Sequence, residues 1–430
     1  MERKIQKKLQ LWKESIHRKP LIIQGARQVG KTFSILNFGK TSYKNLLYFN
    51  FESNGELQRL FDRDLSPKRL LRELSVLSGE TIFEGDSLIV FDEIQACERA
   101  LTSLKYFAEE APTYHLIAAG SLLGVAINRE NYSYPVGKVE LVTLYPLDFE
   151  EFLWALNQHD AALMIRELFK TNAPSALHTS FLDYYKEYLC TGGMPQVVKE
   201  YIETDDYNFV MSLQKSINDA YIADMAKYAS PMETVRIMSV YNSVPSQLAK
   251  ENKKFQYNLI KTGARAALYE APLDWLKASG IVLICQKINA GKFPLIANME
   301  PGAFKVYVSD TGLLCSKYGI TLSTMRSQVA GFNEIKGSLA ENYVATVLVS
   351  NGYSLYYWES QGKAEVDFVI QNSDGEVIPI EVKSSENVRS KSLQQFISRY
   401  NPAYSIRIST KNFGFENNIK SVPLYATFCI

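Results

Sequence analysis

Short apolar segments alternate with segments of helical periodicity along the first third of the chain. Residues 21–24, 46–51, 87–91 and 115–119 are mainly apolar without the alternation of a half-exposed strand, and residues 139–144 are also strand-like. Strands that are apolar on both faces are typical of a parallel sheet covered by helices on both sides. The pattern therefore predicts an α/β domain built on a parallel sheet.

The region after residue 155 has a different, mainly helical pattern. The helices that we expect there comprise residues 161–169, 181–189, 211–226, 258–268 and 272–279. A β-hairpin is expected from residue 281, and helices followed by such a wing resemble a winged-helix fold. Basic residues give this region a positive face that can bind DNA, namely Lys250, Lys253, Lys254, Lys261 and Arg265. A protein-interaction or spacer module with a solvated basic face is the alternative.

A third pattern starts near residue 337, where an apolar helix is followed by several strands. The elements expected there are a helix at 338–349, strands at 353–358, 365–370, 377–382 and 403–408, and a helix at 391–400. We therefore expect an α/β protein with three domains, comprising residues 1–155, 156–325 and 326–430.

Composition and charge narrow the class of protein only slightly. The hydrophobic content of 46% and net charge of +1 describe an ordinary globular chain, so any nucleic-acid site has to be local. The five cysteines are scattered without a C-x-x-C motif, and the four histidines form no metal-binding pattern. No apolar run approaches the ~18 residues of a membrane span. We expect a cytoplasmic protein that has no membrane contact.

The strongest chemical signal lies between the first strand and the helix that follows it. This stretch fits the phosphate-loop pattern G-x-x-x-x-G-K-[ST] and consists of Gly25, Ala26, Arg27, Gln28, Val29, Gly30, Lys31 and Thr32. Backbone N–H groups at a helix N-terminus attract phosphate, Lys31 can reach the β- and γ-phosphates of ATP, and the Thr32 hydroxyl can hold Mg²⁺. The alternative is a chance match in a glycine-containing turn.

Two carboxylates, Asp92 and Glu93, end the apolar strand at 87–91. Acids at the carboxyl end of a buried parallel strand lie where ligands of α/β sheets bind, which matches a Walker B element. Asp92 would hold Mg²⁺, and Glu93 would position or deprotonate the attacking water. An exposed pair of acids at a strand end is the alternative.

The strand at 115–119 is followed directly by Gly120 and Ser121. In this architecture a polar residue at that point lies close to the γ-phosphate, so Ser121 is a candidate sensor of it. A helix N-cap is an equally good interpretation of this serine.

Four sequence stretches together indicate a known family. They are Gly-Ala-Arg-Gln-Val-Gly-Lys-Thr at 25–32, Phe-Asp-Glu-Ile-Gln at 91–95, Ala-Gly-Ser-Leu at 119–122, and Leu-Tyr-Pro-Leu-Asp-Phe-Glu-Glu-Phe-Leu at 144–153. In this order they resemble the prokaryotic AAA-type ATPases with a C-terminal DUF4143 domain, over nearly the whole chain. The resemblance implies an AAA+-like core that binds and hydrolyses ATP with Mg²⁺.

One position departs from the pattern of that family. The turn before residues 139–144 commonly reads Gly-Arg in the family but is Gly137-Lys138 here. If that arginine is a charge-stabilising finger, lysine keeps the charge but loses the planar fork, and Arg129 could substitute for it. The sequence leaves the identity of the finger open between Arg129 and Lys138.

A second constellation of charged residues lies in the last hundred residues. Asp367 belongs to an expected strand, while Glu381 and Lys383 lie on one face of the next strand because side chains alternate. A helical Glu341 can complete the cluster, and the order Glu, Asp, Glu-x-Lys resembles the PD-(D/E)xK nuclease fold. Asp367 and Glu381 would hold Mg²⁺, and Lys383 would orient water or offset charge. Structural salt bridges, or a nuclease-like domain that only binds, are the alternatives.

Two functions from different classes follow from these sites. The first is an ATPase whose nucleotide state is coupled to a nuclease-like domain acting on DNA. The second is a nucleotide-switched regulatory or assembly protein whose last domain only binds DNA or protein. The sequence leaves open whether the chain associates with itself.

Overall fold

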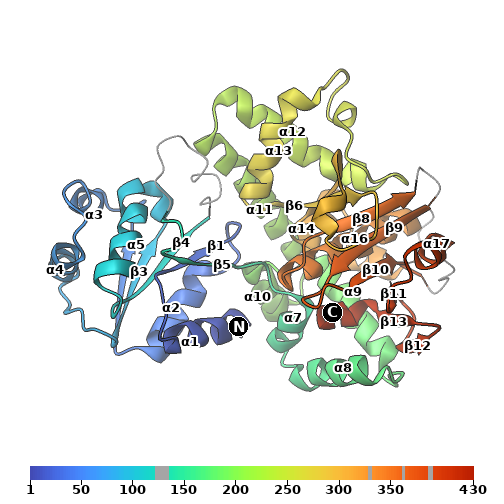
Figure 1. Ribbon diagram of the computed structural model, residues 1–430, viewed down its shortest axis with the longest axis horizontal. Coiled ribbons are helices and arrows are strands. Elements are labelled where there is room, and N and C mark those ends of the chain that lie inside the picture. Colours follow the sequence, from blue (N-terminus) through green and yellow to red (C-terminus); the bar gives the residue numbers. More distant parts are fainter. Residues whose placement is uncertain (122–134, 328–331, 361–363, 386–390) are drawn as a thin grey trace. The chain divides into compact units, whose positions relative to one another are not determined.

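The computed structural model describes residues 1–121, 135–327, 332–360, 364–385 and 391–430. The chain divides into two compact units (Figure 1). The N-terminal unit contains residues 2–145 and 278–280, and the C-terminal unit contains residues 1, 146–277 and 281–430. The division into three domains at residues 155 and 325 stays a prediction.

The N-terminal unit alternates strands and helices as the apolar pattern predicts. Its elements are α1 (Ile5–Glu14), β1 (Leu21–Gln24), α2 (Lys31–Ser42), β2 (Asn45–Asn50), α3 (Gly55–Leu60), α4 (Pro67–Ser78), β3 (Ser87–Asp92), η1 (Ile94–Ala96), α5 (Glu98–Glu110), β4 (His115–Gly120) and β5 (Glu140–Thr143). The described strands form a parallel sheet in the order β2-β3-β4-β1-β5.

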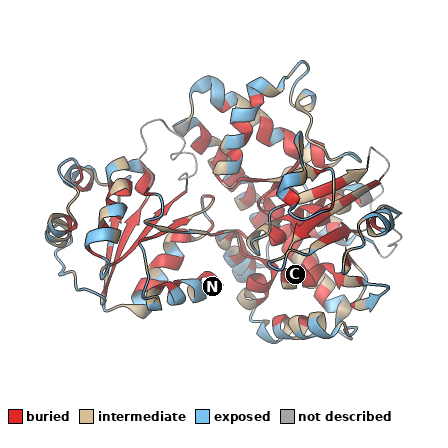
Figure 2. Ribbon diagram, in the orientation of Figure 1, coloured by how far each residue is buried: buried red, intermediate tan, exposed pale blue. Residues whose placement is uncertain are grey.

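Both faces of the central strands β3 and β4 are covered, which explains why these strands are mainly apolar. Alternate residues such as Phe49 and Phe91 pack with α3, α4 and α5 in one buried cluster. On the opposite face, Leu46 and Leu88 contact α2 so closely that a Cβ added at Gly39 would lie 2.5 Å from Leu46 Cδ1. Figure 2 shows β3 and β4 buried along their lengths.

The chain between residues 57 and 77 is not one continuous helix. α3 ends at Leu60, and α4 begins at Pro67. Proline lacks a backbone N–H and is favoured in the first turn of a helix, so a new helix starts there. Phe61, between the two helices, is fully buried and stacks edge-on against Phe51 and Phe91.

Lowering the pH should destabilise the N-terminal unit through His115. This side chain is 5% exposed, its Nδ1 lies 2.6 Å from the Tyr43 hydroxyl, and burial, with Arg18 and Lys13 nearby, lowers its pKa to about 4. Between pH 6.5 and 4 the unfolded chain therefore binds a proton that the folded chain excludes. Stability is unaffected above that window and falls within it, by about 1–2 kcal/mol at pH 5.

This expectation is checked by urea unfolding of the wild-type chain and His115→Gln at pH 7.5 and pH 5. Glutamine cannot take up the proton, so the variant should lose less stability between the two pH values. Equal losses in both proteins would contradict the assignment to His115.

The C-terminal unit begins with a set of helices. These are α7 (Phe149–Ala155), α8 (His159–Thr171), α9 (His178–Thr191), α10 (Pro195–Thr204), α11 (Tyr207–Tyr228), α12 (Pro231–Leu248), η2 (Tyr257–Leu259), α13 (Ala266–Ala278), α14 (Thr311–Tyr318) and α15 (Leu322–Arg326). The helix expected at 258–268 is wrong, because only a 3₁₀ turn and α13 form there. The helix expected at 272–279 is present but begins earlier than expected, because Pro272 lies inside α13.

A mixed sheet organises the rest of this unit. Its strands are β6 (Val282–Ile288), β7 (Met299–Val308), β8 (Tyr356–Ser360), β9 (Ala364–Gln371), β10 (Val377–Val382), β11 (Ser405–Ser409), β12 (Gly414–Glu416) and β13 (Ile419–Pro423). The remaining elements are η3 (Leu295–Asn298), α16 (Phe332–Ser350), α17 (Lys391–Tyr400) and η4 (Leu424–Cys429). The strand order is β12-β13-β11-β10-β9-β8-β6-β7.

The two strands that the sequence suggested as a wing belong to this sheet. β6 pairs antiparallel with β7, as a hairpin would, but its other edge pairs parallel with β8. The pairing joins residues of the middle region to the region after residue 326 in one sheet, so the wing is not a free-standing hairpin.

Three segments that are far apart in the sequence meet inside the C-terminal unit, at Leu147, Gly193 and Asp310. Asp310, the N-cap of α14, accepts hydrogen bonds from Gly193 N at 2.7 Å and Leu313 N at 2.9 Å. Gly193 O in turn accepts from Leu147 N at 2.7 Å. A Cβ at Gly193 would lie 2.0 Å from Leu147 O, so only glycine allows this approach. The stretches therefore have a structural role at one junction.

Candidate functional sites

The phosphate-loop residues form a tight turn between β1 and α2 in the N-terminal unit. Gly25 and Gly30 have φ values of 149° and 90°, and Gln28 has a φ of 66°. A Cβ at Gly25 would lie 2.2 Å from Leu144 O, so glycine is required there for space as well as for conformation. α2 begins at Lys31, and its first N–H groups therefore have no partner within the helix and can bind an anion.

The Lys31 ammonium is held inside this loop. Its Nζ donates to Gly25 O at 2.9 Å and Ala26 O at 2.8 Å, and the residue is 7% exposed. The cation thus lies among the backbone groups that the sequence assigned to phosphate binding.

Two of the predicted Mg²⁺ ligands are already in contact. The Thr32 hydroxyl donates to Asp92 Oδ2 at 2.8 Å, across 60 residues of sequence, and Asp92 is 4% exposed. Asp92 Oδ1 accepts a hydrogen bond from Glu93 N at 3.0 Å. A hydroxyl and a carboxylate at a helix N-terminus are oxygen donors suited to Mg²⁺, so these residues fit that ion.

Glu93 directly follows the strand and turns the chain sharply. Its φ is 50°, and its carboxylate accepts a hydrogen bond from the Gln95 side chain. The left-handed conformation is uncommon outside glycine and is found preferentially at functional turns. The turn and the glutamine contact together orient the acid that the sequence predicts to act on the attacking water.

Ser121 follows β4, which lies between β3 and β1 in the sheet. The residue is 4% exposed, and its hydroxyl has no hydrogen-bond partner among the residues that the structure describes. A buried hydroxyl left unpaired is costly unless a ligand engages it.

The structure describes one of the two candidate finger residues. Lys138 forms an ion pair with Glu109 at 2.9 Å, and Arg129 lies outside the described residues.

Sequence reasoning missed two residues that contact this site. Arg3 is 5% exposed and donates to Val29 O at 3.0 Å and to Tyr145 O at 2.8 Å. Tyr48 donates to Asp92 Oδ2 at 2.7 Å. Burial raises the pKa of Tyr48 to about 12, so its hydroxyl remains a donor at neutral pH. No motif surrounds either residue, and only the tertiary contacts identify them.

The second predicted site lies in the C-terminal unit, where lysines surround Glu341. This carboxylate is 2% exposed and accepts from Tyr307 Oη at 2.5 Å, from Lys305 Nζ at 3.0 Å and from Lys253 Nζ. Burial alone would raise the pKa of Glu341, but the two lysines outweigh burial and hold it at about 2. Lys305 is fully buried and also pairs with Glu365 at 2.6 Å. Glu341 is therefore ionised and internally neutralised.

The other members of this cluster lie in the middle of β9 and at the end of β10. Asp367 Oδ2 accepts from Val382 N at 2.8 Å, and Lys383 Nζ lies 2.7 Å from Glu381 Oε1. Burial, then the nearby Glu381 and Glu341, raises the pKa of Asp367 to about 8. Glu381 is 3% exposed, and its Oε2 has no hydrogen-bond partner within the described part of the chain.

These contacts bring Asp367, Glu381 and Lys383 together, whereas Glu341 is shared with two lysines that the sequence did not place there. Within the described residues, no three or more His, Cys, Asp or Glu side chains are arranged to hold a metal ion. The unpaired Glu381 oxygen beside a second carboxylate nevertheless suits a cation.

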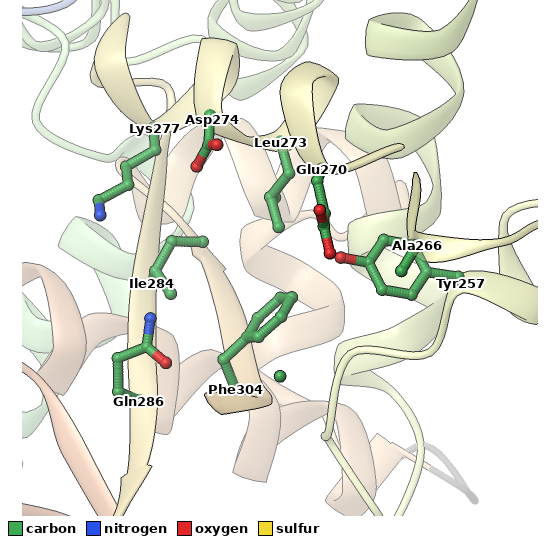
Figure 3. A pocket seen from close by; sticks show the side chains of 10 residues that line it. Tyr257, Ala266, Glu270, Leu273, Asp274, Lys277, Ile284, Gln286 and Phe304 are labelled. Carbon is green, nitrogen blue, oxygen red and sulfur yellow. The ribbon is translucent and has the colours of Figure 1, made fainter. Parts of the chain in front are cut away.

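A cavity of about 320 Å³ lies between α13 and the strands β6 and β7 (Figure 3). Leu273, Ile284 and Phe304 form its apolar lining, and Glu270 and Asp274 line it from α13. Both carboxylates belong to exposed residues, so they remain solvated without a ligand. Acidic residues of this kind do not define a binding site, and we assign none here.

The parallel sheet, the phosphate loop at β1 and the acidic end of β3 together define a P-loop ATPase fold of the AAA type. Family models match the chain in three places: an AAA domain at residues 17–153, a domain of unknown function (DUF8612) at 182–324, and a domain of unknown function (DUF4143) at 336–427. An AAA domain is thus followed by a DUF4143 domain along the chain, in the order that the sequence motifs predicted.

Several solved structures resemble the chain at low identity. The Walker-type ATPase PABY2304 of Pyrococcus abyssi is 15% identical, with 74% of this chain and 95% of that chain covered and a TM-score of 0.46. The ORC2 protein of Aeropyrum pernix is 10% identical, with 72% and 89% covered and a TM-score of 0.32. The RuvB Holliday junction branch migration motor of Thermotoga maritima is 13% identical, with 65% and 87% covered and a TM-score of 0.30.

No curated protein matches the chain significantly. Among the described helices, none is long and apolar enough to span a bilayer.

Proposed function

We propose that this protein binds ATP with Mg²⁺ at the phosphate loop and hydrolyses it. Backbone N–H groups of residues 25–32 and the Lys31 ammonium bind the phosphates. Thr32 and Asp92 hold Mg²⁺, which offsets phosphate charge when bound. Glu93 orients and deprotonates the attacking water, and Ser121 donates to the γ-phosphate.

The hydrogen bond between Thr32 and Asp92 carries this proposal. It joins the phosphate loop to the acidic strand at 2.8 Å, so the metal-binding oxygens of two distant segments converge. Glu93 follows Asp92 directly at the same edge of the sheet, which favours water as the acceptor of the phosphoryl group. A kinase would need room there for a second substrate instead.

The first test of ATP hydrolysis measures phosphate release from ATP by the purified chain, with Mg²⁺ and with EDTA. Release that requires Mg²⁺ supports the proposal, and it should stop when the metal is chelated. A pure, folded chain without measurable release above background would overturn it.

We further propose that nucleotide state is coupled to the C-terminal nuclease-like region, which acts on DNA. Asp367 and Glu381 would hold Mg²⁺ there, and Glu341 would complete the carboxylate cluster. Lys383 would orient water or offset charge on the phosphodiester. The unpaired and buried Glu381 Oε2 supports this assignment, because a carboxylate oxygen buried without a donor is otherwise unfavourable.

One observation favours the alternative of a nucleotide-switched regulatory or assembly protein. Glu341 accepts hydrogen bonds from Lys253, Lys305 and Tyr307, and the two lysine cations neutralise this carboxylate without a metal ion. A region neutralised in this way can bind DNA or protein without cleaving it.

DNA cleavage separates these two functions. Plasmid and single-stranded DNA are incubated with the chain and Mg²⁺ or Mn²⁺, with and without ATP. Under the nuclease proposal, Asp367→Ala should abolish cleavage, because it removes one of the paired carboxylates. Asp374→Ala is the matched control, since Asp374 is exposed in the turn between β9 and β10. Intact ATP hydrolysis without cleavage under any condition would favour the switch.

A further inference from the structure

Tyr48 forms a contact with the nucleotide site that none of the phosphate-binding motifs includes. It lies on β2, beside β3, and its hydroxyl donates to Asp92 Oδ2 at 2.7 Å. The same oxygen accepts from the Thr32 hydroxyl at 2.8 Å. Asn50, two residues further along β2, donates from Nδ2 to the Tyr48 hydroxyl oxygen at 3.3 Å. The phenol is therefore oriented from one side and donates on the other.

These bonds leave Asp92 little freedom. Oδ2 accepts from two hydroxyl groups, and Oδ1 accepts from Glu93 N at 3.0 Å. Oδ2, the oxygen beside Thr32, has both of its lone pairs engaged, so it cannot ligate a metal directly without breaking a hydrogen bond. Oδ1 keeps one lone pair, which can accept a hydrogen bond from water bound to the metal. Mg²⁺ loses its water reluctantly and suits such indirect binding, whereas ions that dehydrate more easily gain from direct ligation.

We infer that Tyr48 is a positioning residue that holds Asp92 in the orientation for water-mediated Mg²⁺ binding and thereby sets the metal selectivity of the site. The inference rests on the proposed nucleotide function. Without the phenol hydroxyl, Oδ2 keeps Thr32 as a donor but gains a free lone pair. Asp92 can then ligate a softer divalent ion such as Mn²⁺ directly.

The exposure of Tyr48 argues against a purely structural role. The residue is 40% exposed, whereas the neighbouring strand residues Leu47 and Phe49 are 2% and 5% exposed and form the core. The hydroxyl of Tyr48 thus serves the site and not the packing of the sheet. Removing it should leave folding nearly unchanged, because the ring remains.

The test compares metal binding to the wild-type chain and to Tyr48→Phe in the presence of ADP. Binding of Mn²⁺ is followed by electron paramagnetic resonance, and Mg²⁺ affinity is obtained by competition. We expect the ratio of Mn²⁺ to Mg²⁺ affinity to rise at least about threefold in Tyr48→Phe, as loss of one hydrogen bond to a charged group implies. Tyr106→Phe on α5 is the matched control and should leave the ratio unchanged.

Each outcome is decisive. An unchanged ratio in Tyr48→Phe would overturn the inference while leaving the nucleotide function intact. A Tyr48→Phe chain that unfolds without ligand would also overturn it, because packing would then explain the contact. A wild-type chain that binds neither metal with ADP would overturn the proposed nucleotide function itself. Mn²⁺-supported ATP hydrolysis should increase relative to Mg²⁺-supported hydrolysis in the same variant.

Discussion

Replacing Lys31 with alanine should reduce ATP hydrolysis by about three orders of magnitude or more, to the background rate. The Lys31 Nζ lies within 2.9 Å of two carbonyl oxygens of the loop, so the cation is positioned inside the turn that binds phosphate. Alanine removes the charge that faces the β- and γ-phosphates in both the bound state and the transition state. Nucleotide affinity and turnover should therefore fall together.

Two measurements check this expectation. Phosphate release gives turnover, and fluorescence of an N-methylanthraniloyl ATP analogue gives affinity. Lys40→Ala is the matched control, because Lys40 is exposed in the last turn of the same helix α2. Unchanged turnover in Lys31→Ala would contradict the assignment of this loop as the ATPase site.

Glu93→Gln should bind ATP as the wild-type chain does but hydrolyse it about 10²–10⁴-fold more slowly. Glutamine has nearly the same shape as glutamate and can adopt the same turn at φ 50°. It cannot accept a proton from water, so only the chemical step is affected. A complex that retains ATP should accumulate.

Binding and single-turnover hydrolysis, measured on the same preparation, distinguish the possible roles of this acid. Glu110→Gln is the control, since Glu110 is an exposed residue at the end of α5. Loss of ATP binding in Glu93→Gln would show that Glu93 has a structural role at the turn and is not the base.

The nucleotide site was predictable from sequence because its determinants are local. Residues 25–32 are contiguous in the sequence. The apolar run that ends at Asp92 predicts a buried strand and shows where this strand ends. Parallel pairing then brings the two segments to one edge of the sheet, as the Thr32–Asp92 contact shows. The helix α7 likewise begins at the capping box formed by Asp148 and Glu151, within the motif that indicated the family.

The surroundings of Glu341 were not predictable in this way. Lys253 and Lys305 lie 88 and 36 residues from it, and of the two only Lys253 belonged to a predicted feature, the basic face. A lysine on a strand reads as exposed, yet Lys305 is fully buried because three acids, Glu341, Glu365 and Asp367, stabilise its charge. This charge compensation depends on which elements pack together, and the hydrophobic periodicity of the sequence does not indicate it.

The sequence by itself determined the phosphate loop, the acidic strand, the alternation of strands and helices, and the family. Each of these depends on residues close together in the chain, or on patterns that repeat within one element. The tertiary structure decided that Tyr48 and Arg3 contact the nucleotide site, that β6 and β7 extend the C-terminal sheet, and that lysines neutralise Glu341. These features come from contacts between distant segments, whose free energy depends on mutual burial and charge pairing that form only when the chain has folded.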